Sequence, residues 1–600
     1  MPDIKTVDLS STTGAYFAPA TLAPKDAQIM HIAGQAGALA NGTVPTDYES
    51  QIELALLNIR KILLVAGAAV KDILKLNLYI VNYDPKKRVH TRHVQKFLNG
   101  HRPAITLVPV LQLASPEWLF EADAVVARPS DPIPHSLPLG KSPDVDVVII
   151  GAGLAGLNAA LELQKAGVSF VILEARDRVG GKTWSPAIPG DEGGVVDLGA
   201  AWINDVNQQR AYSLARKFGA EFLEQNTTGR CVLQDAGGKI STFEYGELPK
   251  FDTAIAHDVA RIRDMVEADC QTLDPVRPRN AEWDSLTFEA YLKSRGASKE
   301  ALATATVWTR AMLGHDPRDI SALYFLTYCR SGGGLLQMRS DRKGGGQHLR
   351  LREGMQSIAS GIAKTLPEQS IQLSSPVSSI IQSPSGVEVV TNKSIFARKA
   401  IITVPTPVLK TITFSPALTP AKKLWAESSI YGYYTKAMMI FRTPFWVEKG
   451  YCGLIQSFTG PASVIRDTSS LPDQKYVLTC FMSGDPGREW ASLSTGDREK
   501  ALITQIGKLF NAESEASRDF VQMVTYEWCN DPYSGWGCPC IALTPGVLDA
   551  VGEAAREQDG NLHFAGTETA RVWRGYMEGA LESGERAAGE VVTGLSSARL

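Results

Sequence analysis

Residues 145–174 read VDVVIIGAGLAGLNAALELQKAGVSFVILE. The first six form an almost continuous apolar run, which is typical of a strand buried on both faces of a parallel sheet. An amphipathic segment closed by Gly167 follows, and residues 168–174 form a second, mostly apolar run. The order of strand, helix and strand predicts a βαβ unit at the start of an α/β domain.

The turn between the first strand and the helix carries the motif G-x-G-x-x-G at Gly151, Gly153 and Gly156. Glycines at these positions permit a tight turn and let backbone N–H groups at the helix N-terminus approach a pyrophosphate. Glu174 ends the second strand about twenty residues further on, where its carboxylate can accept hydrogen bonds from ribose hydroxyls. We therefore predict a dinucleotide site at these four residues, although the glycines alone do not distinguish NAD from FAD.

The residues after Glu174 distinguish the two cofactors. They read ARDRVGGKTWS, residues 175–185, and resemble the second glycine motif of FAD enzymes in the flavin amine oxidase family. The resemblance implies cofactor contacts at Arg176, Gly181 and Lys182. A phosphate-binding P-loop is excluded, because that motif requires a glycine five residues before Gly181, where this chain has arginine.

A second resemblance covers residues 560–592, which read GNLHFAGTETARVWRGYMEGALESGERAAGEVV and match the C-terminal FAD-binding segment of monoamine oxidases. It implies that Gly566 and Glu568 lie along the pyrophosphate and ribityl chain of FAD. It also implies that Met577 offers a backbone N–H to the flavin, and that Tyr576 stands against the isoalloxazine ring as a catalytic residue. The alternative for Tyr576 is an ordinary core aromatic.

Two shorter stretches extend this resemblance. Residues 374–380, SSPVSSI, are similar to the strand that contacts adenine through its backbone, which implies a contact at Val377. Residues 432–453, GYYTKAMMIFRTPFWVEKGYCG, are similar to the monoamine oxidase strand that carries a lysine under the flavin, which implies a catalytic role for Lys436. In the family this lysine holds a water where reduced flavin meets oxygen. The alternative is an edge-strand lysine that faces water.

The stretch GWGCPC, residues 535–540, contains two cysteines. In the monoamine oxidase pattern Cys538 takes the position that some members bond to the 8α-methyl carbon of FAD, whereas others bind FAD without a bond. Cys540 is expected to be a small buried side chain, and we predict no metal site because further ligands at suitable spacing are missing. Pro539 occupies the place of one aromatic wall around the substrate amine, so Trp536 or another aromatic would have to replace that wall.

The implied activity is an FAD-dependent amine oxidase whose partners are a small-molecule amine and O2. The stretches DLGAAWIND (197–205) and CFMSGDPGREW (480–490) resemble fungal amine oxidases that deaminate long-chain aminopolyols of the fumonisin type. The alternatives are a generic monoamine oxidase and a polyamine oxidase, which would require acidic residues along its substrate tunnel.

Residues 14–127 resemble the Rid (YjgF-like) imine deaminases, through GAYFAPA, HIAGQAG, RPAITLVPVLQL and FEADAVVA. Tyr16 and Glu121 match positions of the Rid site. The family has an arginine after the Pro-Ala pair that clamps a substrate carboxylate, whereas this chain has Ile105. We therefore expect a scaffold or oligomerisation element, with a bifunctional oxidase and imine deaminase as the alternative. Because Rid proteins are trimers, a homo-oligomer is expected.

The predicted architecture is α/β plus α+β, with a Rossmann-type FAD-binding domain, a mixed-sheet substrate domain and a preceding small α+β domain. The expected divisions are 1–127 for the Rid-like domain, 128–144 for a Pro-rich linker and 145–600 for the oxidase. Within the oxidase, the FAD-binding segments are expected at 145–250, 345–410 and 550–592, and the substrate-domain segments mainly at 251–344 and 411–549.

Net charge, apolar runs and cysteine content limit the classes of binding partner and the cellular compartment that we expect for this chain. A net charge of −3 over 600 residues provides no basic field for nucleic acid, and no apolar run is long enough to span a membrane. Eight scattered cysteines and the lack of a leader pattern favour a reducing intracellular compartment. The chain ends in Ala598-Arg599-Leu600, a tripeptide similar to the peroxisomal SKL signal, so a peroxisomal location is a further expectation.

Overall fold

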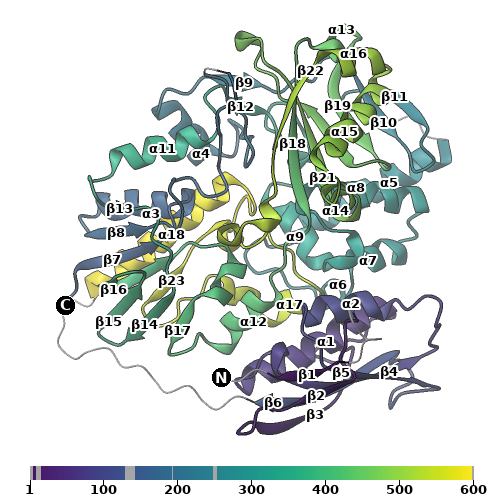
Figure 1. Ribbon diagram of the computed structural model, residues 1–600, viewed down its shortest axis with the longest axis vertical. Coiled ribbons are helices and arrows are strands. Elements are labelled where there is room, and N and C mark those ends of the chain that lie inside the picture. Colours follow the sequence, from purple (N-terminus) through teal and green to yellow (C-terminus); the bar gives the residue numbers. More distant parts are fainter. Residues whose placement is uncertain (1–3, 9–14, 129–141, 192, 248–252, 598–600) are drawn as a thin grey trace.

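The computed structural model describes residues 4–8, 15–128, 142–191, 193–247 and 253–597. Figure 1 shows a small N-terminal module beneath a larger unit formed by the rest of these residues. Most of the predicted linker and the C-terminal tripeptide lie outside the described residues.

The predicted βαβ unit lies inside an eight-stranded sheet. Strand β7 (Val145–Ile150) pairs in parallel with β8 (Phe170–Leu173) on one side and with β16 (Ser394–Ile402) on the other. Residues 147–150 are fully or almost fully buried, which explains the continuous apolar run. The Rossmann-type prediction is confirmed. The remaining strands of this sheet are β13 (Ile371–Gln372), β14 (Ser379–Ser383), β15 (Gly386–Val390), β17 (Thr413–Ser415) and β23 (Leu562–Phe564).

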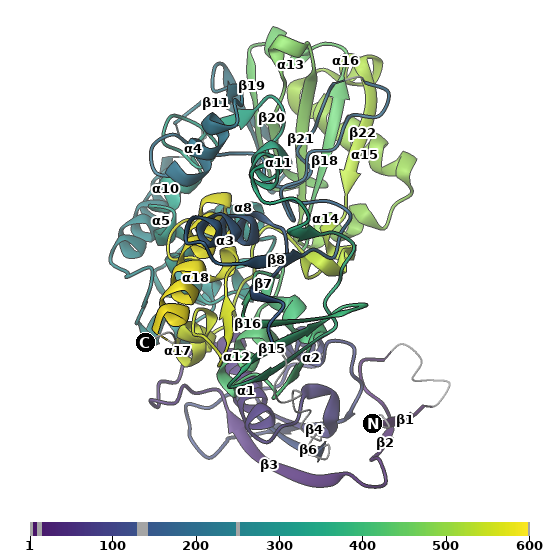
Figure 2. The same cartoon turned by 90° about the vertical axis from the view of Figure 1, so that its left-hand side faces the viewer.

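Helix α3 (Leu154–Lys165) begins at the glycine turn, and the last helix, α18 (Met577–Ser597), packs along it (Figure 2). Their backbones are so close that a Cβ atom on Gly584 would lie 2.1 Å from the carbonyl oxygen of Ala155. The end of the chain therefore completes the domain that the βαβ unit begins. Helices α4 (Gln209–Lys217) and α11 (Gln356–Thr365) contribute to the same apolar core.

A second sheet has seven strands in the order β11-β10-β19-β20-β21-β18-β22. Strand β18 lies between β21 and β22, so it is an inner strand. The bounds are β10 (Arg230–Gln234), β11 (Ile240–Glu244), β18 (Tyr434–Phe441), β19 (Tyr451–Ser457), β20 (Ala462–Asp467), β21 (Tyr476–Ser483) and β22 (Phe520–Tyr526). Helices α13 (Phe445–Glu448), α14 (Gly484–Ala491), α15 (Thr495–Phe510) and α16 (Glu513–Asp519) belong to the same unit.

The predicted division of the chain at residue 250 is wrong in one part. We expected residues 145–250 to belong to the FAD-binding part, but β10 and β11 pair within the seven-stranded sheet. Val232 on β10 lies opposite Ile455 on β19, and both side chains are buried in the core of that sheet. Two short apolar runs in the sequence do not reveal which distant strand they will pair with.

Helices fill the space between these two sheets and the N-terminal module. Gly296, which has a φ of +73°, separates α7 from α8. The helices of this layer are α5 (Thr253–Gln271), α6 (Ala281–Ser285), α7 (Phe288–Ser294), α8 (Lys299–Leu313), α9 (Ala322–Ser331), α10 (Leu335–Met338), α12 (Pro420–Ser428) and α17 (Val547–Val551). A two-stranded ladder joins β9 (Phe222–Glu224) to β12 (Leu349–Leu351).

The N-terminal module is a four-stranded sheet in the order β3-β6-β4-β5 with two helices, which agrees with the predicted α+β pattern. Its helices face the rest of the protein, and its sheet lies on the far side (Figure 1). The bounds are β1 (Lys5–Val7), β2 (Ala20–Leu22), β3 (Gln28–Ala36), α1 (Tyr48–Val65), β4 (Ile73–Val81), α2 (His90–Leu98), β5 (Ala104–Val110) and β6 (Phe120–Arg128).

Helix α1 is apolar on two faces. Ile52 and Ile59 pack in the core of the module itself, whereas Leu57 and Leu64 belong to the core cluster of the larger unit. Across the interface, a Cβ atom on Gly546 would lie 3.0 Å or less from three leucine side chains of the module, Leu39, Leu54 and Leu57. The module is therefore packed against the oxidase unit through a shared apolar surface.

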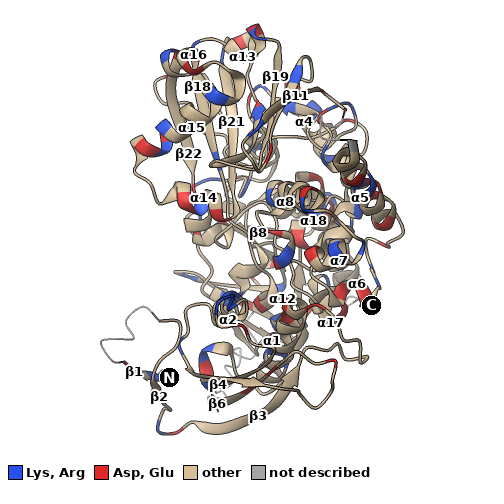
Figure 3. Cartoon of the chain, turned by 90° about the vertical axis from the view of Figure 1, so that its right-hand side faces the viewer, with Lys and Arg blue, Asp and Glu red and all other residues tan. Residues whose placement is uncertain are grey.

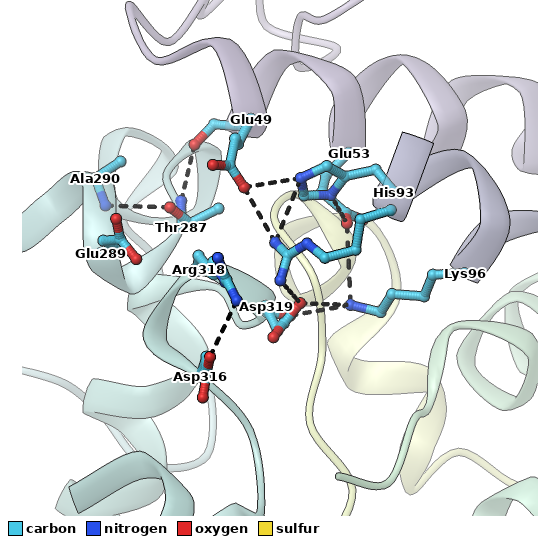
Figure 4. A network of polar contacts seen from close by, with 12 residues as sticks. Glu49, Glu53, His93, Lys96, Thr287, Glu289, Ala290, Asp316, Arg318 and Asp319 are labelled. Carbon is cyan, nitrogen blue, oxygen red and sulfur yellow. Dashed lines mark hydrogen bonds and ion pairs between the residues drawn. The ribbon is translucent and has the colours of Figure 1, made fainter. Parts of the chain in front are cut away.

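A network of charged groups also joins the module to the larger unit (Figure 4). Asp319 of the larger unit pairs with Arg92 at 3.1 Å and with Lys96 at 3.7 Å, both on α2. The buried His93 ring bonds to the carboxylates of Glu53 at 2.7 Å and Glu49 at 2.8 Å. These two bonds raise the pKa of His93 although burial opposes them. Asp319 therefore connects helix α2 to the larger unit.

Blue and red segments are interspersed over the side shown in Figure 3, which agrees with the small net charge. No helix within the described ranges is long and apolar enough to cross a membrane.

Candidate active site

A cavity of about 340 Å³ is lined by residues of both large sheets and of the loops that join them. It brings together segments that are far apart in the sequence, from residue 150 to residue 580. All predicted site residues except Gly156 line it. They are Gly151, Gly153, Glu174, Arg176, Gly181, Lys182, Val377, Lys436, Cys538, Gly566, Glu568, Tyr576 and Met577.

The glycine turn leaves an open space at the start of α3. Gly151 has a φ of +106°, a conformation that favours glycine, and a Cβ atom there would lie 2.7 Å from Thr403 Oγ1. Gly153 is the N-cap residue of α3 with an ordinary φ of −72°, and a Cβ atom there would meet nothing within 4 Å. The helix N-terminus is therefore open to an anion such as a pyrophosphate.

Gly156 was predicted to contact the dinucleotide, but its position in the structure gives it a different role. It is buried within α3, where a Cβ atom would lie 2.0 Å from the carbonyl oxygen of Gly151. The absence of a side chain lets the helix pack closely on the turn. Gly156 thus supports the shape of the site and does not line it.

The buried Glu174 carboxylate accepts hydrogen bonds from two backbone N–H groups, of Ala152 at 2.7 Å and of Arg176 at 2.9 Å. Burial raises the pKa of this carboxyl above its usual range, while the two bonds oppose that change. Because a carboxylate has about four lone-pair sites, two remain for other donors. Glu174 is thus fixed in place with acceptor capacity to spare.

Arg176 pairs with Asp531 through two contacts, at 2.8 and 3.0 Å. The same carboxylate accepts the backbone N–H groups of Tyr533 at 2.9 Å and Ser534 at 3.1 Å. It thereby caps the short helical turn that precedes Cys538 in the chain. Arg176 therefore links the end of β8 to the cysteine loop, and no sequence pattern indicated a role for Asp531.

Glu568 is buried, and Tyr431 supplies the partner that its carboxylate needs. The Tyr431 hydroxyl donates to Glu568 Oε1 at 2.6 Å and accepts a short hydrogen bond from the Lys182 ammonium. Lys182 itself lies 4.0 Å from Glu568. A positive charge and a hydroxyl therefore balance the buried carboxylate.

Gly181 and Val377 also lie where a bound cofactor would pass. A Cβ atom on Gly181, whose φ is +58°, would lie 3.3 Å from the Cα atom of Gly153, so the two glycine turns are adjacent. Val377 precedes β14, which begins at Ser379. Its role as an adenine contact remains a prediction.

Lys436 lies on β18, an inner strand, and its side chain is buried. The alternative of an edge lysine facing water is therefore wrong. The ammonium donates to the carbonyl oxygen of Gly199 and to that of Asp197 at 3.2 Å. It also lies 5.2 Å from the ring centre of Trp202. Burial lowers the pKa of Lys436 to about 8.

Tyr576 directly precedes α18 and lines the cavity, with one edge packed on Trp573 at 4.9 Å between ring centres. Trp536 cannot supply a second aromatic wall, because it is 43% exposed and does not line the cavity. Five other aromatic residues do line it. They are Trp202, Tyr328, Tyr434, Phe481 and Tyr533.

The two cysteines of GWGCPC are separated by their surroundings. Cys538 is buried, lines the cavity next to Pro539, and has its pKa raised by burial. Cys540 is fully buried in the helical core, where its sulfur lies 3.9 Å from the Tyr324 hydroxyl. The prediction of a small buried side chain at Cys540 is confirmed, and a bond from Cys538 to FAD remains a prediction.

The cavity has a cationic end. Its carboxylates among the described residues are Glu174 and Glu568, both already predicted as cofactor contacts. Away from these two residues the charged lining consists of Arg339, Arg466 and Lys436. Arg466 forms an ion pair with the buried Asp341, which lies outside the described lining. Burial lowers the pKa of Arg339 to about 10, so this guanidinium is still charged at neutral pH.

Comparison with known proteins identifies the family. Residues 154–592 match the model described as flavin containing amine oxidoreductase. The chain belongs to this family. A protein of Dictyostelium discoideum named probable flavin-containing monoamine oxidase A is 32% identical over 468 residues, which is 76% of this chain and 99% of that protein. The chain is therefore a flavin-containing amine oxidase, and FAD is its cofactor.

Solved structures agree with the fold of this amine oxidase. Cyclohexylamine oxidase from Brevibacterium oxydans IH-35A superimposes with a TM-score of 0.70 at 29% identity, covering 76% of this chain and all of the other. Putrescine oxidase bound to putrescine superimposes with a TM-score of 0.69 at 24% identity, covering 75% of this chain and 99% of the other. Residues 14–128 match the family described as Endoribonuclease L-PSP, which confirms the Rid-like N-terminal domain.

The site of the amine oxidase fits FAD on its own geometry. The open N-terminus of α3 above Gly153 can hold the pyrophosphate, and Glu174 has free acceptor positions for the ribose. Lys436, Tyr576 and Cys538 line the other end of the same cavity, where the flavin ring would lie. These residues would hold the cofactor between the two large sheets.

A covalent bond at Cys538 is expected to leave FAD on the enzyme after denaturation. Cys538→Ala should then release all yellow colour into the supernatant of an acid-precipitated sample, whereas wild type and Cys540→Ala keep it in the pellet. Cys540 is a matched control because it is two residues away but lies outside the cavity lining. Complete release of FAD from denatured wild type would contradict the bond.

Proposed function

We propose that the enzyme oxidatively deaminates long-chain primary amines that carry oxygen functions, such as aminopolyols of the fumonisin type. The observation that carries this proposal is the cationic end of the cavity, formed by Arg339, Arg466 and Lys436. When bound, FAD accepts hydride equivalents from the carbon that bears the nitrogen and passes them to O2, giving an imine, which hydrolyses to a carbonyl and ammonia, and hydrogen peroxide.

The residues of the chain select the neutral form of the amine. Removal from water disfavours an ammonium ion, and nearby positive charges on Lys436 and Arg466 disfavour it further. Both effects lower the pKa of a bound amine, so its lone pair is available. Tyr576 and the other aromatic side chains of the lining exclude water from the reacting carbon.

The same charges argue against a polyamine. A diamine bound through one neutral nitrogen would bring its second, protonated nitrogen toward Arg339 or Arg466. Like charges in a partly buried cavity repel strongly, and the one carboxylate that offsets part of this charge is the buried Asp341, which pairs with Arg466 and does not belong to the described lining. A substrate with hydroxyl or ester oxygens would instead accept hydrogen bonds from the guanidinium groups.

The lining between the two arginines and Lys436 suits an alkyl chain. It is formed mainly by apolar side chains, with Gln347 and Gln456 as further hydrogen-bonding groups. The apolar members include Ala311, Met312, Leu454, Val464 and Phe481. A long aliphatic chain with spaced hydroxyls matches this mixture of apolar surface and scattered polar groups.

The N-terminal module is proposed to be structural. Ile105 packs against the apolar core of the module, so the position of the family's clamping arginine is apolar. The helices of the module pack against the oxidase unit. The sheet of the module lies on the far side, and we propose this sheet as the surface for a homo-oligomer. An intracellular and peroxisomal location is proposed on the C-terminal tripeptide alone.

A panel of amines with peroxide detection tests the substrate class. An aminopolyol is expected to give a lower KM than the alkylamine of the same chain length, and a diamine a higher one. Arg339→Met should raise the KM for the aminopolyol by about tenfold or more, the value of a charged hydrogen bond, and leave the alkylamine unchanged. Preference for a diamine, or an equal effect of the variant on both amines, would contradict the proposal.

A further inference from the structure

Two cysteine side chains are in contact on adjacent strands of the seven-stranded sheet. Cys231 on β10 and Cys452 on β19 have their sulfur atoms 3.5 Å apart. The two strands pair in parallel, with Arg230 opposite Tyr451 and an irregularity in register immediately afterwards. Both cysteines are at most 1% exposed. No other pair of thiols makes such a contact in the described part of the chain.

The two thiols lie next to residues that line the active-site cavity. Cys231 and Cys452 share an apolar cluster with Leu454, and the Leu454 side chain also lines the cavity. Arg466, another lining residue, is close enough to act on the charge of Cys231. The thiols therefore share a neighbour, Leu454, with the active-site cavity.

The contact makes the two thiols unequal. The contact with Cys231 lowers the pKa of the Cys452 thiol, although burial opposes that change, and the same contact raises the pKa of Cys231. A thiolate is the form of cysteine that reacts with peroxide, so we assign Cys452 as the thiol that peroxide attacks first. Cys231 is then the neighbouring thiol that can resolve the first oxidation product.

We propose that Cys231 and Cys452 are a redox modification site at which the enzyme's own hydrogen peroxide forms a disulfide. The inference rests on the proposed function, because the oxidant is the product of amine oxidation. The sulfur atoms are in contact, and the bond requires them to approach from 3.5 Å to about 2.05 Å. Adjacent strands can make this small movement.

The reaction balances in two steps. The Cys452 thiolate attacks one oxygen of hydrogen peroxide, the O–O bond breaks, and the hydroxide that leaves takes up a proton to become water. Cys452 is then a sulfenic acid. The Cys231 sulfur attacks the Cys452 sulfur, the S–O bond breaks, and the departing hydroxide takes the Cys231 proton as a second water. Two thiols are oxidised and one peroxide is reduced.

Mass spectrometry of the full-length holoenzyme tests the site. Reduced enzyme is treated either with reagent hydrogen peroxide or with amine and oxygen, and free thiols are then alkylated before digestion. We expect the Cys231 and Cys452 peptides to be joined with loss of two hydrogen atoms, and dithiothreitol to separate them. Catalase should prevent the link in both arms.

Cys529 is the internal control, because it is more exposed than either thiol but has no thiol partner in the described residues. Oxidation at Cys529 with both paired thiols fully alkylated would overturn the proposal. A Cys231→Ser variant should leave Cys452 as a sulfenic acid that dimedone traps. A link with reagent peroxide but no peroxide from any amine would support the site and refute the proposed function.

Discussion

Gly153→Val is expected to give a folded protein that has lost at least about nine-tenths of its FAD, because the new side chain fills the space of the pyrophosphate. The fold should tolerate the change, since Gly153 has a φ of −72° and a Cβ atom there meets nothing within 4 Å. Flavin absorbance of the purified protein measures the loss, and circular dichroism with thermal unfolding measures the fold.

Two other glycines separate loss of cofactor from loss of fold. Gly589→Val on the exposed side of α18 also adds a side chain where a Cβ meets nothing within 4 Å, and it should keep full FAD content. Gly156→Val should fail to fold, because its Cβ would lie 2.0 Å from a carbonyl oxygen. Normal FAD content in folded Gly153→Val would show that the pyrophosphate lies elsewhere.

Lys436→Met is expected to slow reoxidation of the reduced enzyme by O2 about 10²- to 10³-fold, the usual effect of removing one preorganised charge or donor from a dry site. Its ammonium is buried, held by two backbone carbonyls and directed at the cavity. Negative charge develops on oxygen as it is reduced, and the cation stabilises that charge. Reduction by the amine under anaerobic conditions should change much less.

The pH dependence provides a second signature of Lys436. Burial lowers its pKa to about 8, so the ammonium is charged below that pH and neutral above it. The rate of reoxidation in wild type should therefore be high below pH 8 and fall as pH rises through it. Lys436→Met should be slow and flat over the same range. Equal slowing of reduction and reoxidation, or an unchanged pH profile, would contradict this role.

All residues predicted to contact the cofactor, except Gly156, line one cavity of the structure. Gly151, Gly153 and Glu174 lie on one short βαβ unit, where spacing along the chain fixes spacing in space. Gly566, Glu568 and Met577 are equally local, between β23 and the start of α18. In a short motif, the spacing of residues along the chain determines their arrangement in space. The order of strands in the sheet then brings the two motifs together in one cavity.

The side chains that form hydrogen bonds or ion pairs with these residues could not be predicted from the sequence. Tyr431 reaches Glu568 and Asp531 reaches Arg176 through contacts that span more than one hundred residues of sequence. Such long-range pairs leave no local pattern. Trp202, Tyr434 and Phe481 lay within stretches that resembled the family, but their sequence surroundings did not show which side of each strand faces the cavity.

The N-terminal module was predicted as a fold but not as a docked domain. Ile52, Ile59 and Leu63 lie on one face of α1 and are buried in the core of the module. Leu57 and Leu64 on the other face are also apolar, and that second face is the signal of an interface. A helix that is apolar on both sides must be covered on both sides, which the oxidase unit does here.

Anaerobic addition of a long-chain aminopolyol to the purified yellow protein tests the central claim most directly. The visible absorbance of oxidised FAD is expected to bleach as the amine is oxidised, and to return when oxygen is admitted, with one hydrogen peroxide formed for each amine consumed. Bound FAD that stays oxidised in the presence of every primary amine offered would contradict the assignment of this cavity as an amine oxidase site.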